Sequence, residues 1–451
     1  MRTSQSPLKA IFTLQKSEVP LALSMFSYFF LVITSFWILK PIKKKLFIEY
    51  YDQTGFDLLT WHMSAAQAEL LAKVLNMAVA FVAVIVFTWL VRRFRRQQLS
   101  FIFTGFFLLS YVVYSLVIND PGDLTVWSFY LFGDLFSTLM VATFFAFLND
   151  SVTPEAAKRM YGLVGLGGVT GGVFGSMVVW RLIALVTDAS WLWICFGLGL
   201  LILVVAFASG RLVDRQRPAT PQEVTPAASD ETSTTARGNP ALEGARLVFR
   251  SPYLLSIVGI VGLYEIVSTV LDFQFTSTIA HYLTGPAIGQ QFSTVFLITN
   301  IVSLLVQLFL TSFVMTRFGL GVALLILPIA TLVGSAGFMV VPVLWVGSLL
   351  NTVDNSFSYS INQSAKEALY VPTTPDEKYK AKAFIDMFVQ RFAKALAVVV
   401  SLVITAVFQD FASLRWLSLF TLLIIGLWIV AARYAGRHFR AVTETAETPQ
   451  V

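Results

Sequence analysis

The chain of 451 residues is 56% hydrophobic and only 13% charged, and its mean hydropathy is +0.74. Soluble domains carry roughly 25% charged residues, so this composition excludes a soluble fold and indicates a polytopic membrane protein. The formal charge of +6 does not predict nucleic-acid binding, because the basic residues lie in short loops between apolar segments. One cysteine and three scattered histidines predict neither a disulfide nor a metal site.

Apolar runs of about 20 residues predict the membrane spans. There are twelve: 20–39, 65–91, 99–118, 124–148, 161–186, 191–209, 253–273, 291–316, 321–341, 343–364, 384–408 and 414–433. The segment between the sixth and seventh is rich in Pro, Ser, Thr and charge, which is typical of a linker. We therefore expect an all-α membrane protein with two six-helix halves, 1–209 and 251–440, joined by a cytoplasmic linker, 210–250, and followed by a polar tail, 441–451.

Basic residues between the spans predict the orientation of the chain. They cluster in alternate loops, which places those loops and both termini in the cytoplasm of a bacterial cell; the basic stretches are 92–96, 158–159, the linker, Arg317, 378–382 and 433–440. The far end of the first span breaks this pattern with Lys40, Lys43, Lys44 and Lys45. For Lys43 and Lys44 we favour binding of lipid phosphates at the membrane surface.

Polar residues inside the spans recur at every third span. The first span ends in Lys40, the fourth carries Asp134, the seventh carries Glu265 and Asp272, and the tenth carries Asp354. In a transporter built from three-helix repeats, equivalent helices occupy equivalent places, so these spans are expected to line one cavity in the major facilitator arrangement. The alternative is hydrogen bonding between helices at less than about 2 kcal/mol each, which fits single serines better than clustered carboxylates.

Three further cations lie within the spans. A charge at a lipid-exposed helix centre costs about 2.5–3.5 kcal/mol, so each should face water or a partner. Lys73 lies four residues after Glu69, and an internal ion pair and contact with an anionic substrate are equally open. Arg391 and Lys394 have no carboxylate among their nearest helical neighbours, which favours a functional role.

The glycine-rich stretch GLVGLGGVTGGVFG, 162–175, superficially resembles a phosphate-binding loop. No strand precedes it, and Gly167, Gly171 and Gly175 form small-xxx-small repeats, so it predicts close helix packing. No catalytic triad, zinc spacing or Walker loop accompanies the intramembrane charges, so we expect neither an enzyme nor a cofactor.

KEALYVPTTPDEKYKAKAFIDMFVQRFAKAL, 366–396, resembles the signature loop of the ATP/ADP antiporter family of plastids and intracellular bacteria. Similarity extends to ILKPIKK at 38–44, LLAKVLNM at 70–77, 133–167 and RFGLGVALLILP at 317–328. The resemblance implies twelve helices of the major facilitator type and nucleotide exchange at a central site of paired lysines and carboxylates. It implies substrate-site roles for Lys73, Asp134 and Glu265.

The sequence departs from the family at two charged positions. Leu325 stands where the resemblance implies a lysine, and Lys44 stands at an acidic position. A site that lacks one cation would hold a tri- or tetra-anion less well, so the resemblance carries the fold but not the ATP/ADP specificity.

The leading hypothesis is an alternating-access transporter for a small anionic, nucleotide-like solute, with ATP and ADP as candidates. Its expected binding residues are Lys40, Lys73, Asp134, Glu265, Asp272, Asp354, Arg391 and Lys394. Two alternatives stay open: a proton-coupled carrier of another metabolite or lipid, and a non-transporting membrane scaffold. Membrane lipids are expected partners and nucleic acid is not. Substrate identity, direction of flux, coupling ion and oligomeric state do not follow from the sequence.

Overall fold

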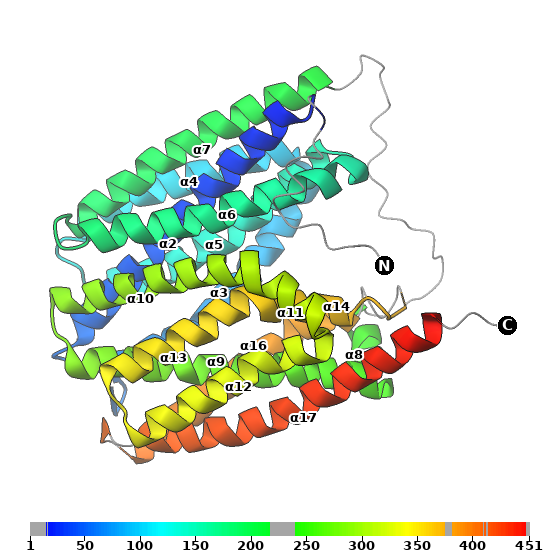
Figure 1. The fold of residues 1–451 in the computed structure, drawn as a ribbon. Helices are drawn as coiled ribbons and strands as arrows, with labels where there is room; N and C mark the ends of the chain where they lie inside the picture. The colour runs from blue at the N-terminus through cyan, green and yellow to red at the C-terminus, as the bar shows by residue number, and fades with distance from the viewer. Residues whose placement is uncertain are drawn as a thin grey trace.

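The computed structural model describes residues 15, 17–216, 240–374, 381–408, 410–411 and 414–447. Two groups of helices run along a common long axis, one above the other in Figure 1, with α3 between them. The first group is α2 (Val19–Tyr51), α3 (Ala65–Arg93), α4 (Arg96–Val117), α5 (Asp123–Ser151), α6 (Pro154–Leu182) and α7 (Asp188–Gln216). The second group contains α8 (Pro240–Arg250), α9 (Pro252–Tyr282), α10 (Pro286–Leu305), α11 (Ser312–Arg317), α12 (Leu320–Val340), α13 (Leu344–Phe357), α14 (Gln363–Leu369), α15 (Lys382–Phe384), α16 (Gln390–Val407) and α17 (Leu414–Glu447).

Eleven described helices are long and apolar enough to cross a membrane. The remaining expected span, 343–364, is a continuous helix in which α13 passes through the π-helical η2 (Ser358–Asn362) into α14. Two more π-helical segments, η1 (Val306–Thr311) and η4 (Ile385–Val389), interrupt the eighth and eleventh spans. The all-α membrane fold in two halves is confirmed.

Short segments differ from the expected pattern. An antiparallel hairpin of β1 (Phe56–Leu58) and β2 (Trp61–Met63) follows α2. Both ends of the expected linker are helical, because α7 continues to Gln216 and α8 begins at Pro240; its middle, 217–239, lies outside the described residues. The expected tail is helical to Glu447, and residues 375–380 of the charged turn are also outside the described part.

The first span is longer than expected. Hydropathy predicts its end at residue 39, but α2 continues through Pro41 to Tyr51. Its C-terminal part is buried, since Phe47 and Ile48 are fully covered. Lys43 and Lys44 are also only 4% exposed. The prediction that these two lysines lie at the membrane surface is therefore wrong. Hydropathy places the end of a span at its first charged residues, whether or not those residues are paired inside the protein.

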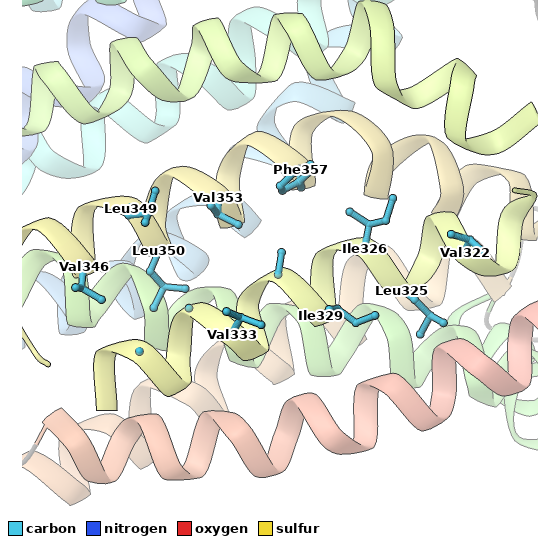
Figure 2. A pocket seen from close by; sticks show the side chains of 13 residues that line it. Val322, Leu325, Ile326, Ile329, Val333, Val346, Leu349, Leu350, Val353 and Phe357 are labelled. Atoms are coloured by element: carbon cyan, nitrogen blue, oxygen red, sulfur yellow. The ribbon is translucent and has the colours of Figure 1, made fainter. Parts of the chain in front are cut away.

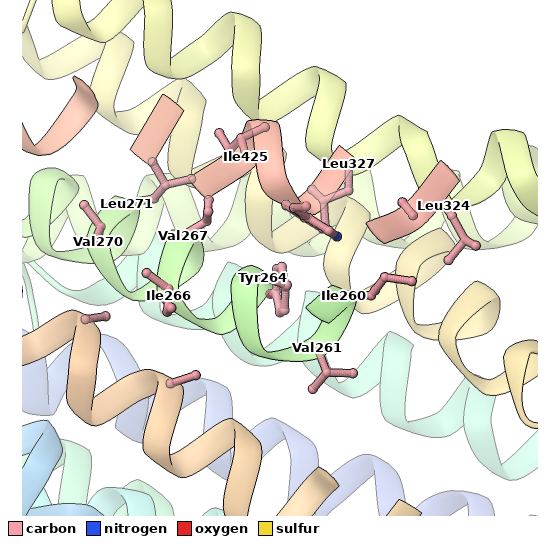
Figure 3. Packing of buried hydrophobic residues seen from close by; sticks show 14 of the residues in the cluster. Ile260, Val261, Tyr264, Ile266, Val267, Val270, Leu271, Leu324, Leu327 and Ile425 are labelled. Carbon is pink, nitrogen blue, oxygen red and sulfur yellow. The ribbon is translucent and has the colours of Figure 1, made fainter. Parts of the chain in front are cut away.

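Each half has its own apolar core. In the second half, α17 packs against both α9 and α12, and Figure 3 shows Val267 and Leu271 of α9 facing Ile425 of α17. The first half is rich in stacked rings, such as Phe29 on Phe144 with centroids 4.6 Å apart. Separate cores allow the halves to move as bodies, which alternating access requires.

A third apolar cluster joins the two halves. It brings Phe47 of α2 together with Phe275 of α9 and Phe292 of α10, near the end of the bundle where α2 terminates and the β-hairpin begins.

The glycine-rich face of α6 packs against α2, as the small-xxx-small spacing predicts. A Cβ added at Gly167, Gly171 or Gly175 would lie 2.5–2.6 Å from a backbone oxygen of α2. Such approach is possible only without side chains. The packing interpretation is confirmed.

We expect Gly171→Ala to destabilise the protein by about 1–3 kcal/mol, because its Cβ would lie 2.5 Å from the Phe30 carbonyl oxygen and overpack the contact. Gly165→Ala is the matched control, since it lies on the same helix with no heavy atom within 4 Å of an added Cβ. Thermal unfolding of the purified variants checks this. Equal melting temperatures would show that the α2–α6 contact is not tight.

Candidate functional site

The two halves are linked by an ion pair between α2 and α9. Lys44 Nζ lies 3.0 Å from both carboxylate oxygens of Asp272 and also donates to the Thr276 hydroxyl at 3.3 Å. The same ammonium lies 3.4 Å from Glu69 Oε1 of α3. A single lysine therefore joins a carboxylate of its own half to one of the opposite half.

Lys73 of α3 makes a second bridge. It lies 3.0 Å from Glu69 Oε2 and forms a shorter ion pair with Asp272. The internal Glu69–Lys73 pair considered from the sequence is thus present, and the lysine also reaches across to α9. Asn351 of α13 completes the surroundings of Asp272, donating from Nδ2 at 3.4 Å.

Asp134 of α5 belongs to the same assembly. Lys43 pairs with it, and Asn76 donates to its other oxygen at 3.0 Å. The Lys43 ammonium also lies 4.3 Å from the centre of the Tyr130 ring, and the Tyr130 hydroxyl donates to Glu69 at 2.5 Å.

We call this assembly the central charge network; its members are Lys43, Lys44, Glu69, Lys73, Asp134 and Asp272. Its three cations balance its three carboxylates. Lys43, Lys44 and Glu69 are almost fully buried, and pairing with opposite charges offsets the cost of taking them out of water. The sequence analysis named four members as binding residues or ion-pair candidates: Glu69, Lys73, Asp134 and Asp272. It missed Lys43 and Lys44, although the apolar LFI that follows them, 46–48, was a signal that the helix continues.

Lys40 has a different environment from the other lysines of α2. Its ammonium lies 4.4 Å from the ring centre of Trp37, 4.9 Å from that of Phe296 and 5.9 Å from that of Tyr359. Among the described residues, no carboxylate lies within ion-pair distance of it. Aromatic faces stabilise a cation without neutralising it, so the rings offset part of the cost of placing this ammonium inside the protein.

Apart from Asp272, the predicted residues of the second half form no ion pair with the central charge network among the described residues. Lys394 is 3.6 Å from Glu265. This partner comes from α9, whereas the sequence analysis considered only the neighbours of Lys394 on its own helix. Asp354 accepts a hydrogen bond from Ser268 at 2.7 Å. Arg391 donates to the backbone oxygen of Met77 on α3 at 3.1 Å, which ties α16 to the first half.

Leu325 was considered the place of a missing site cation. Figure 2 shows it beside Val322 and Ile329 of α12, in a groove of about 730 Å³ that α13 closes on the other side. The residues that line this groove include no ionisable side chain. Position 325 therefore faces an apolar, membrane-exposed surface, and a cation there would not act on the central charge network.

We expect Lys73→Gln to lower the stability of the ligand-free protein by about 3 kcal/mol, because Glu69 and Asp272 would then share only Lys44. The double variant Lys73→Gln/Glu69→Gln restores the charge balance and should be more stable than the single one. Thermal unfolding without ligand measures both. If the added Glu69→Gln change lowered the stability further instead of restoring it, the Glu69–Lys73 pair would be solvated and energetically unimportant.

Comparison with known proteins agrees with this arrangement. Residues 21–369 match the profile of the Major Facilitator Superfamily, and residues 338–439 match that of the TLC ATP/ADP transporter.

The chain is 24% identical over 355 residues to ADP,ATP carrier protein 1 of Chlamydia pneumoniae, covering 71% of this chain and 68% of that protein. It is also 24% identical to the chloroplastic ADP,ATP carrier protein 1 of Arabidopsis thaliana, covering 72% of this chain but only 56% of the longer plant protein. The crystal structure of a nucleoside transporter NupG variant superposes with a TM-score of 0.63 at 14% identity, covering 94% of this chain and 99% of that one. The fold and the profile that covers most of the chain establish that this protein belongs to the Major Facilitator Superfamily.

Proposed function

We propose that this chain is a nucleotide exchanger that carries ATP and ADP across a bacterial cytoplasmic membrane by alternating access, with both termini in the cytoplasm. The observation that carries the proposal is the pairing of Lys44 and Lys73 with Asp272 between the halves. The match to the TLC profile and the names of the relatives support a nucleotide as the solute.

The central charge network explains why such a carrier would exchange and not leak. In the empty protein, separating the halves would strand Asp272 without its cations, and breaking a buried pair costs several kcal/mol. A bound phosphate chain offers Lys44 and Lys73 a replacement anion. Asp272 is then released and the halves can reorient. Only the loaded carrier crosses readily, so influx requires efflux.

Lys40 supplies the point of first contact. Its charge is not neutralised by a carboxylate in the described structure, and it lies one helical turn before Lys43 and Lys44. The rings of Trp37, Phe296 and Tyr359 around it present faces on which a nucleobase can stack. A site that binds a phosphate at its lysines and stacks a base on its rings suits a nucleotide better than a simple inorganic anion.

The scaffold alternative predicts fully satisfied polar packing, and the second half does not match it. Asn351 Oδ1, Asp354 Oδ1 and both amide atoms of Asn362 are buried without a hydrogen-bond partner among the described residues. Unsatisfied buried groups are costly. They are understandable where a ligand completes the bonding.

Exchange in liposomes tests the proposal. Vesicles that contain the purified protein and internal ADP should take up external ATP, whereas vesicles without internal nucleotide should take up little. Equal uptake into both would refute exchange.

Within the proposal, we expect Lys40→Gln to weaken ADP binding by about 1.5–3 kcal/mol, the value of a hydrogen bond to a charged group, or roughly 10- to 150-fold in Kd. Lys45→Gln is the matched control: Lys45 is on the same helix but is paired with Asp188 at 2.9 Å, outside the central charge network. Calorimetric titration with ADP measures both. A similar loss in the two variants would place Lys40 outside the site.

We expect Leu325→Lys to leave ADP affinity within about twofold of the wild type and to lower the melting temperature, because its side chain lies in the apolar groove of α12 and α13. Calorimetry and thermal unfolding measure these separately. Tighter nucleotide binding would show that position 325 reaches the substrate.

A further inference from the structure

Asp354 is the one predicted carboxylate that the structure leaves without a cation. It is 1% exposed on α13. The Ser268 hydroxyl donates to Oδ2 at 2.7 Å, and Oδ1 has no hydrogen-bond partner in the described part of the chain. By contrast, Glu69, Asp134, Glu265 and Asp272 each pair with a lysine.

In the described part of the chain, none of the elements packed around Asp354 pairs a cation with it. α9 packs against α13 and carries Tyr264, Glu265 and Asp272. The following η2 carries Tyr359, whose ring lies 5.9 Å from the ammonium of Lys40, and Lys40 forms no ion pair with Asp354. The sequences of α10 and α12 contain no Asp, Glu, Lys, Arg or His. On α16, Lys394 is paired with Glu265 and Arg391 is bonded to α3.

A buried carboxylate among further carboxylates must be neutralised from outside the protein. We propose that Asp354 is a binding site for a proton that the carrier takes up together with its anionic substrate. The proton comes from water, binds at Oδ1 and is returned to water when the substrate leaves on the other side. This inference rests on the proposed anion transport, and it adds a coupling ion to it.

Substrate and proton would communicate through Asp272. Asn351 donates to Asp272 and lies one turn from Asp354 on α13. When Lys44 and Lys73 turn to a bound phosphate chain, Asp272 loses its cations. Its negative charge then repels a charged Asp354 more strongly. The free energy of protonation therefore improves when the anion binds, and by linkage the anion binds better when Asp354 is protonated.

The test is proton uptake on ADP binding, measured for the purified full-length chain in a weakly buffered solution with a pH indicator. The wild type should take up between a fraction of a proton and one proton per bound ADP. Asp354→Asn should still bind ADP but should take up fewer protons per bound ADP than the wild type. The difference between the two proteins is the proton uptake at Asp354. The ionisation of ADP itself is the same for both proteins and cancels in the difference. Asp120→Asn, an exposed carboxylate between α4 and α5, is the matched control and should behave as the wild type does.

A second measurement follows ADP affinity against pH. In the wild type, the affinity for ADP should fall by up to tenfold per pH unit above the midpoint, the pH at which Asp354 loses its proton. In Asp354→Asn this fall should be absent. Ser268→Ala keeps the carboxylate and should move the midpoint upward, because it removes a donor to the charged form. This variant serves as the test if Asp354→Asn fails to fold.

Three outcomes would overturn the inference. One is undiminished proton uptake by Asp354→Asn, another is a Ser268→Ala midpoint equal to that of the wild type, and the third is loss of ADP binding when choline replaces sodium, which would make this a sodium site. Each leaves nucleotide binding itself intact in the wild type in sodium buffer. Failure of the wild type to bind ADP there would instead refute the proposed function.

Discussion

Asp272 lies between the two halves with its side chain 27% exposed, and its charge is stabilised by cations that its own half does not supply. It belongs to α9, yet both of its cations, Lys44 and Lys73, come from the first half. Because the desolvation cost of each charge is offset only while the partners stay in contact, the relative position of the halves is coupled to electrostatic balance. The long α2, which carries the lysines deep into the bundle, and the aromatic cluster above them are arranged around that requirement.

The central charge network also distinguishes the roles of the two halves. In the first half, Glu69 and Asp134 are paired with lysines of the same half. In the second half, the polar stripe of α13 retains buried atoms without partners. Under the proposed function, the first half would supply the cations that bind the anion, and α13 of the second half would supply polar groups that respond to it.

The sequence predicted the fold well because membrane spans depend on local hydropathy. The glycine face of α6 was equally predictable, since small-residue spacing is local. Pairings between distant helices were not predictable. The partner of Lys394 lies on another helix, which the spacing of residues along its own helix could not reveal. Lys43 and Lys44 were taken for surface residues because hydropathy does not distinguish a paired charge from an exposed one. Leu325 was judged by its place in a motif, whereas its helix turns it toward an apolar groove.

The π-helical segments have a geometric consequence. All three described examples, η1, η2 and η4, belong to the second half, and η2 follows directly after Asp354 and Asn355 on the same continuous helix. A π-turn holds one extra residue per hydrogen-bonded ring, so the helical faces before and after it are out of register. The side chains of α13 and those of α14 therefore do not follow one α-helical stripe, although the helix is continuous.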